Sequence, residues 1–318
     1  MNTKIPNNVL ILMLISSILQ QTALALPEEN VLKPYDGPSI HGADSSTLTG
    51  KVMTGYQGWF NCEGDGTDLG WTHWARDRNK AFGPGNITVD LWPDVSEYDD
   101  DELYTTAFTY EDGTPAKTFS SHNRKTVVRH FRWMADYEID GAFVQRFAHS
   151  LHDKTKRYHK DKVLSSAREG ANRYGRTYAV MYDLTGVQRH AKQYWEQDVI
   201  WAHKHDIDYM PVVFPGFSWY NLKGTKLDSI PRLDGQFLWS QVIANKRAGV
   251  NMLYIAMFDE VDEGTAIFKC TNNPPNIGGS KFLTLDGLPG DFYLRLAGQA
   301  GKLLRDEIPL STTVPVAR

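Results

Sequence analysis

The chain of 318 residues has little of what several common classes of protein require. It contains only two cysteines, too few for a small scaffold built from disulfides. Its net charge is −4 and its isoelectric point about 6.2, so it lacks the basic excess of a nucleic-acid-binding protein. Beyond the N-terminal segment no run approaches about 20 apolar residues, so no transmembrane helix is expected there.

The motifs of several enzyme classes are also missing. No GxGxxG or GxxxxGK[ST] follows a strand-like run, no GxSxG occurs, and no HExxH occurs. His149-x-x-His152 and His203-x-His205 come nearest to a metal motif, and we interpret them as solvated or packed histidines. The sequence therefore predicts neither a metal nor a cofactor. Neither Cys62 nor Cys270 lies in an activating context; a disulfide between them and two buried thiols are equally compatible with the sequence.

Aromatic residues are plentiful. They make up 12% of the chain, including nine tryptophans and fifteen tyrosines, a content common where sugar rings are stacked. Hydrophobic residues at 41% and charged residues at 23% are typical of a globular protein. The composition thus excludes wholesale disorder and gives a first hint of carbohydrate binding.

The N-terminus has the pattern of a secretory signal. Lys4 precedes an apolar stretch over residues 9–19, and the small-x-small sequence Ala23-Leu24-Ala25 follows it. The apolar core is too short to span a bilayer, although an N-terminal membrane anchor is the alternative. We expect a signal peptide at residues 1–25, a secreted protein (extracellular or periplasmic), no membrane attachment after cleavage, and one domain over residues 26–318.

Strand-like and helix-like segments alternate along the mature chain. The strand-like runs are continuously apolar, as expected for strands covered on both faces, and such alternation is typical of parallel βαβ units. We therefore expect an α/β protein, a (β/α)8 TIM barrel, with an open doubly wound sheet as the competing fold. The expected strands are 51–60, 87–91, 141–147, 177–184, 209–214, 252–258 and 282–285, and the expected helices 125–137, 162–174, 188–205, 235–248 and 292–305.

In such a barrel the active site lies at the carboxyl ends of the strands. Gln145 and Arg146 are adjacent in one strand, so at most one of them should point inward. His73 and Asp183 are equally compatible with a structural role. The residues expected to contact the substrate are Tyr56, Trp59, His73, Trp74, Asp90, Gln145, Tyr182, Asp183, Trp219 and Asp259.

An acidic cluster follows the apolar run MLYIAMF. Asp259, Glu260, Asp262 and Glu263 would repel one another unless they are solvated, protonated or opposed by cations. A solvated loop is the ordinary explanation, but the buried strand before the cluster and the turn Gly264-Thr265 after it favour a functional site. Glycoside hydrolysis requires one acid to protonate the departing oxygen and a second carboxylate as base or nucleophile. We therefore expect Glu260 and Glu263 to be the catalytic pair.

These segments resemble a known group of enzymes. Residues 258–265, FDEVDEGT, resemble the Asn-Glu-Trp-x-Glu-Gly-Thr segment of glycoside hydrolase family 99, the endo-α-mannosidases, and the family 71 α-1,3-glucanases carry a similar acidic pair. Most of the mature chain is similar to secreted bacterial proteins often labelled xylosidase/arabinosidase and grouped with families 71 and 99. The segments that carry this likeness are GYQGWF at 55–60, GDG at 64–66, GWTHW at 70–74, DLWPDVSEY at 90–98, DGAFVQRF at 140–147 and FLTLDGLPGDFYLRLAG at 282–298.

The resemblance implies a (β/α)8 barrel that acts on α-linked glycans without a metal. It implies that Glu263 is the general acid/base, and that Glu260 assists attack at the anomeric carbon, in family 99 by deprotonating the 2-hydroxyl to form an anhydrosugar. Asp259 stands where the family has Asn, and Val261 where it has Trp. The second departure changes a packing or subsite position, so mannose is not implied as the substrate.

The sequence therefore predicts a secreted, metal-independent glycoside hydrolase that cleaves a polysaccharide or glycan, acts as a monomer and binds no nucleic acid. The alternative is a non-catalytic carbohydrate-binding barrel, which would keep the aromatic platforms but need no acid at position 263. A lyase or aldolase would require a strand-end lysine or a metal cluster. Neither is found in the sequence.

Overall fold

The computed structural model describes residues 31–32, 35–183, 210–247, 250–275 and 280–318. The chain divides into two compact units, residues 1–33 and 34–318, and the second is described below. The expected signal peptide, the expected helix 188–205 and His203 and His205 lie outside the described residues. Within the described part, every helix is too short or too polar to cross a membrane.

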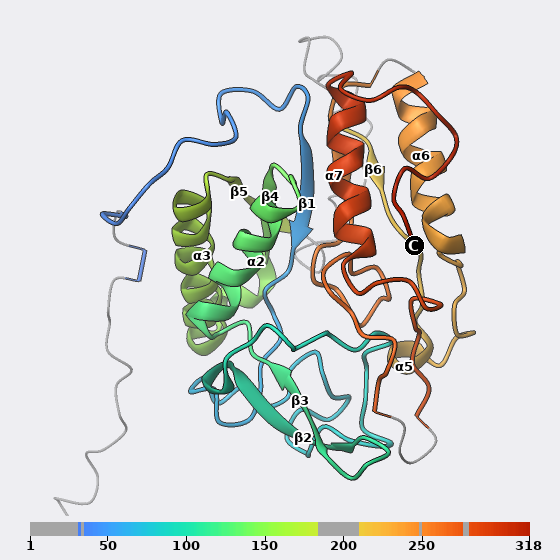
Figure 1. Cartoon of the computed structure of the whole chain (residues 1–318). Helices are drawn as coiled ribbons and strands as arrows, with labels where there is room; N and C mark the ends of the chain where they lie inside the picture. The colour runs from blue at the N-terminus through green and yellow to red at the C-terminus, as the bar shows by residue number, and fades with distance from the viewer. Residues whose placement is uncertain (1–30, 33–34, 184–209, 248–249, 276–279) are drawn as a thin grey trace, which may run out of the picture. The chain divides into compact units, whose positions relative to one another are not determined.

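The centre of the second unit is a parallel sheet of five strands (Figure 1). The strand order is β5-β4-β1-β7-β6, and every neighbouring pair is parallel. The sheet confirms the predicted parallel α/β architecture, while the eight strands of a closed barrel are not seen among the described residues. The strands are β1 Val52–Tyr56, β4 Gly141–Phe147, β5 Thr177–Asp183, β6 Val212–Val213 and β7 Leu253–Ile255.

Four helices pack on this sheet and on one another. Helices α2 and α3 pack together, with α3 against β4 and β5, and α7 packs against β1 and α6 (Figure 1). The four helices are α2 Arg124–Asp136, α3 Lys154–Tyr174, α6 Gln236–Arg247 and α7 Phe292–Leu304. Shorter helices are η1 Asp100–Glu102, η2 Ala148–His152, α5 Tyr220–Lys223 and η3 Leu233–Gly235.

Local capping explains where α3 begins. The side chain of Asp153 accepts a hydrogen bond from the backbone N–H of Lys156, and the helix ends at Gly175, whose φ of 59° suits a residue without a Cβ. The helix therefore starts before the predicted residue 162. Its first two turns are charged and carry no apolar spacing, so periodicity could not find them.

Two expected strands are absent, and the structure contains a hairpin that was not expected. Residues 87–91 and 282–285 form no strand; the N–H groups of Asp90 and Leu91 instead donate to the carbonyl of Val261, and that of Leu283 donates to the carbonyl of Asp90. The unexpected antiparallel pair is β2 Leu103–Thr109 and β3 Pro115–Phe119. The Asp112-Gly113 turn between them is a hairpin signal that the sequence analysis missed.

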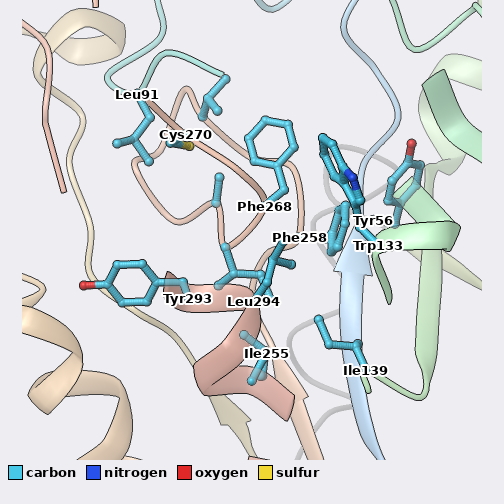
Figure 2. Packing of buried hydrophobic residues seen from close by; sticks show 14 of the residues in the cluster. Tyr56, Leu91, Trp133, Ile139, Ile255, Phe258, Phe268, Cys270, Tyr293 and Leu294 are labelled. Atoms are coloured by element: carbon cyan, nitrogen blue, oxygen red, sulfur yellow. The ribbon is translucent and has the colours of Figure 1, made fainter. Parts of the chain in front are cut away.

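Most of the described tryptophans belong to the core. Trp71, Trp74, Trp92, Trp133 and Trp239 are buried, and only Trp59 and Trp219 are partly exposed. Phe258, in the loop after β7, lies with its ring 5.9 Å from that of Tyr56 and 6.2 Å from that of Phe268 (Figure 2). The aromatic content therefore reflects core packing more than sugar stacking.

The two faces of the sheet have different neighbours. On one face Tyr56 packs on Phe131 of α2, and Arg146 pairs with Asp161 of α3. On the other face the rings of Phe143 and Tyr254 lie 5.8 Å apart across Gly55 of the intervening strand. This second face carries the candidate site.

Candidate active site

The acidic loop, residues 259–263, is held in place from several sides. The N–H of Phe258 donates to the carbonyl of Gly55, and the N–H groups of residues 265 and 266 both donate to the carbonyl of Glu260. The buried guanidinium of Arg232 donates to the carbonyls of Gly264 (2.9 Å) and Ala266 (2.7 Å). These bonds fix the backbone, so the carboxylates cannot simply turn outward to water.

Asp259 is a fully buried carboxylate that holds the chain after β1. Its two oxygens accept hydrogen bonds from the N–H groups of Gln57 and Gly58, each 2.9 Å long. Burial raises the pKa of Asp259 to about 6, against the lowering effect of these two bonds. Asp259 therefore joins the end of β1 to the acidic loop and has no surface on which to receive a sugar.

Glu260 is 4% exposed and has a protein partner for one oxygen. Its Oε2 accepts a hydrogen bond of 3.2 Å from the side-chain amide of Gln57. Burial and then the charges of Asp262 and Glu263 raise its pKa well above the ordinary value for glutamate. The free protein thus holds a proton within this group of carboxylates near neutral pH.

Glu263 is more exposed than Glu260 and lies beside a tryptophan. Its carbonyl accepts a hydrogen bond from the N–H of Ser218, which brings Trp219 next to the loop. Burial and the charge of Asp262 raise the pKa of Glu263, while Trp219 and Lys223 partly oppose that rise. The indole N–H of Trp219 is buried and faces this carboxyl group.

A stack of rings leads away from the acidic loop. Oδ2 of Asp262, a carboxylate only 2% exposed, lies 3.2 Å from Nδ1 of His73. The imidazole is stacked on Trp59 at 3.8 Å with an interplanar angle of 4°, and the ring of Phe147 lies 5.5 Å from Trp59 at 16°. His73 and Trp59 are thus near the site, but Trp59 is already stacked with two protein rings.

Gln145 and Asp183 lie on the site face of the sheet, and Tyr182 does not. The amide of Gln145 donates to Oδ2 of Asp183 at 2.8 Å, which joins the ends of β4 and β5. Tyr182 pairs in register with Arg146, whose guanidinium lies 6.0 Å from the tyrosine ring. Tyr182 therefore belongs to the opposite face, because successive strand residues alternate between faces.

Three expected substrate contacts turn out to be interior supports. Tyr56, Trp74 and Asp90 have no exposed surface. The Tyr56 hydroxyl and the Trp74 indole bond to His130 and to a core carbonyl, while the oxygens of Asp90 accept from the N–H groups of Tyr220 and residue 221 at 2.8 Å. These three side chains position the site without lining it, and Asp90 does so by holding the segment that follows Trp219.

Sequence reasoning missed Tyr254, which looked like one apolar residue among many in its strand. A Cβ on Gly55 would lie 2.1 Å from the Tyr254 hydroxyl oxygen, so the absent side chain makes room for that group. Burial, together with the charges of Glu260 and Asp259, raises the pKa of Tyr254. The hydroxyl therefore lies within the field of the acidic loop. Tyr254 is in register with Met53, which shares a face of the sheet with Gly55, and no signal in the sequence places β7 beside β1.

The described residues offer little to a metal ion. Their one group of three possible ligands is Asp99, Asp101 and Glu102, away from the acidic loop. Lys125 pairs with Asp99 and Asp101, and Arg129 pairs with Glu102. These cations already balance the carboxylates. Cys62 and Cys270 are both buried and free, so the structure contains the two thiols and not the disulfide.

Comparison with solved structures identifies the fold. The structure matches the endo-α-mannosidase of glycoside hydrolase family 99 from Bacteroides thetaiotaomicron with a TM-score of 0.56 and 14% identity, over 82% of this chain and 99% of that one. The chain shares the fold of that enzyme. A complex of the same enzyme with bis-tris-propane matches with a TM-score of 0.51 and 15% identity over 82% and 99% of the two chains. No protein-family model and no curated protein sequence matches the chain.

Proposed function

We propose that the protein is a glycoside hydrolase that uses Glu260 and Glu263 as its catalytic pair. The observation that carries the proposal is a pair of carboxyl groups in the loop after β7 of a parallel sheet, whose pKa values are both raised by burial and by the charge of Asp262. The fold shared with a family 99 endo-α-mannosidase supports it. A raised pKa keeps an acid protonated near neutral pH, as protonation of a glycosidic oxygen requires.

Glu263 is the better candidate for the general acid. It is partly exposed, as is Trp219 beside it, so both side chains are accessible to a bound sugar. Glu260 lies deeper and is held by Gln57, so its second oxygen is the one left to assist attack at the anomeric carbon. The resemblance to family 99 supports the same division of roles, in which Glu263 carries the retained proton and Glu260, as the ionised carboxylate, deprotonates a sugar 2-hydroxyl.

The remaining parts of the proposal concern the protein's setting. We propose that the chain is exported after cleavage of a signal peptide at residues 1–25, that it acts as a monomer without a metal, and that its substrate is an α-linked glycan. Trp59, His73, Gln145, Asp183 and Trp219 are the proposed sugar contacts.

Release of reducing ends from a panel of α-mannan, α-glucan, xylan and arabinan tests the proposal. We expect the mature protein to act on at least one polymer, and both Glu263→Gln and Glu260→Gln to lose at least about 1,000-fold in turnover. Glu111→Gln, an exposed glutamate in the β2–β3 turn, is the matched control and should keep full activity.

Two results would decide against the assignment. Near-wild-type hydrolysis by Glu263→Gln would remove that residue from catalysis. No release from any polymer, combined with retardation of the protein by one of them in affinity electrophoresis, would favour the non-catalytic carbohydrate-binding barrel instead.

A further inference from the structure

A cavity of about 560 Å³ lies beside the acidic loop on the far side of the ring stack. Trp59 at the end of β1, Phe147 at the end of β4 and the first turns of α3 form its walls. None of its twelve described lining residues is acidic, and its charged lining consists of Arg78, Lys156 and Lys160. We call it the basic cavity.

Lys160 is the most enclosed cation of the basic cavity. Its ammonium group lies 5.8 Å from the centre of the Phe147 ring. Burial, then the charges of Arg146 and Lys156, lower the pKa of Lys160 to about 8. The charge of Arg146 is met by Asp161, whereas neither Lys160 nor Lys156 has an ion-pair partner in the described part of the chain.

The carboxylates around the cavity are engaged by other protein groups. An oxygen of the exposed Asp153, at the start of α3, accepts a hydrogen bond from the N–H of Lys156. Asp65 accepts a hydrogen bond from the side-chain amide of Asn61, and Asp262 lies 3.2 Å from His73. His159 in the cavity wall has a pKa lowered to about 3 by burial, and its Nε2 bonds to the carbonyl of Gly58. This imidazole is therefore neutral, and the lysines and Arg78 set the sign of the cavity.

We propose that the basic cavity binds an anionic sugar unit of the substrate, one that carries a carboxylate, sulfate or phosphate group. Lys156 and Lys160 are four residues apart on α3, so their ammonium groups repel each other on the same helix face. An oxyanion between them relieves that repulsion and accepts charge-assisted hydrogen bonds. The cavity volume lies within the range of small-ligand sites.

The basic cavity lies close to the proposed hydrolase site. The inference that the anionic unit belongs to a glycan substrate rests on the proposed hydrolase function. His73 lines the cavity, stacks on Trp59 and bonds through Nδ1 to Asp262 of the acidic loop. The basic cavity and the acidic loop are thus separated by one pair of stacked rings. A glycan that spans both would place a neutral sugar at the carboxylates and a charged unit beside the lysines.

Calorimetric titration of the full chain with glucuronate, glucose 6-sulfate, glucose 6-phosphate and glucose at constant ionic strength tests the proposal. We expect at least one anionic sugar to bind ten-fold or more tightly than glucose, and the preferred sugar identifies the acidic group. Lys160→Met should reduce that preference at least five-fold, and so should Lys156→Met at its exposed position. Lys162→Met, which removes a lysine of the same helix outside the cavity lining, should leave the preference unchanged.

Equal affinity for glucose and all three anionic sugars overturns the inference, and so does a preference that survives both cavity substitutions. Because binding is measured without turnover, the outcome is separable from the proposed function. If Glu263→Gln loses hydrolysis and the protein shows no preference for anionic sugars, the hydrolase assignment holds and the anion site does not. If the protein prefers anionic sugars through Lys160 and its hydrolysis does not depend on Glu263, the anion site holds and the catalytic assignment does not.

Discussion

Nδ1 of His73 lies 3.2 Å from Oδ2 of Asp262, and this contact joins the wall of the basic cavity to the acidic loop. The two residues are 189 positions apart in the chain. His73 adopts a φ of 64°, in the left-handed region that residues other than glycine seldom occupy. The charge of Asp262 is in turn the largest influence on Glu263 after burial.

Replacement of Asp262 by Asn should shift the pH dependence of hydrolysis. The charge of Asp262 raises the pKa of both Glu260 and Glu263, so its removal lowers both values. The general acid then loses its proton at a lower pH, and the alkaline limb of kcat/KM should move down by about one pH unit. Asp286→Asn, at an exposed turn, is the control; an unmoved limb in Asp262→Asn would show that its charge does not act on the acid.

Asp259 should make the folded state less stable as the pH rises. Its pKa of about 6 in the folded protein exceeds the ordinary value of 3.8, so the folded state binds the proton more tightly than the unfolded state. The stabilisation that Asp259 gives the folded state therefore decreases by about 3 kcal/mol as the pH rises from about 4 to about 6, and it is constant above that range.

Urea unfolding of the wild type and of Asp259→Asn across that range measures this effect. The free energy of unfolding of the wild type minus that of the variant should decrease by roughly 3 kcal/mol as the pH rises from about 4 to about 7. A difference that rises with pH, or stays level, would contradict the burial of an ionisable carboxyl at this position.

Gly55→Ala should disturb the site more than it disturbs the rest of the fold. The added Cβ would lie 2.1 Å from the Tyr254 hydroxyl oxygen and 2.3 Å from the Met257 sulfur. We expect a loss of stability of about 1–3 kcal/mol and at least a ten-fold loss of kcat, because both neighbours must move. Gly301→Ala in α7, where the nearest atom belongs to a flexible arginine, should be neutral or stabilising.

Tyr254→Phe should lower turnover without unfolding the protein. The hydroxyl donates only to the sulfur of Met257 at 3.3 Å, a weak acceptor, so its removal leaves no strong buried acceptor unpaired. We expect a fall in kcat of about ten-fold or more with a thermal midpoint within a few degrees of the wild type. Tyr174→Phe at the end of α3 serves as the control, and equal kcat values for the two variants would place Tyr254 outside the reaction.

Much of the local structure could be predicted from the spacing of apolar residues. The expected strand 141–147 coincides with β4, and the helices expected at 125–137 and 292–305 differ from α2 and α7 by a residue at their ends. Each segment buries a continuous face, so its period is visible without knowledge of its partners. The strand expected at 87–91 did not form, because the backbone of this segment bonds to the acidic loop and not to a neighbouring strand.

The candidate site was predicted in part. The acidic loop was found because four carboxylates directly follow an apolar strand. Gln57 and Tyr254, which lie beside Glu260, were not among the expected site residues. Gln57 is one of several polar residues at strand ends, and a tyrosine in an apolar run carries no local signal. Tyr56, Trp74 and Asp90 were expected to contact the substrate because of their residue type. Only tertiary packing determines whether a side chain is exposed, and these three are buried.

The amino-acid sequence by itself determined the alternation of strands and helices, and the acidic segment after β7, because both are properties of neighbouring residues. Tertiary structure decided the electrostatics. Glu260 receives its hydrogen bond from Gln57, 203 positions away, and the pKa values of the acidic loop depend on how completely distant segments exclude water from it. The energy of a charge is set by everything around it in space, and the chain order does not contain that information.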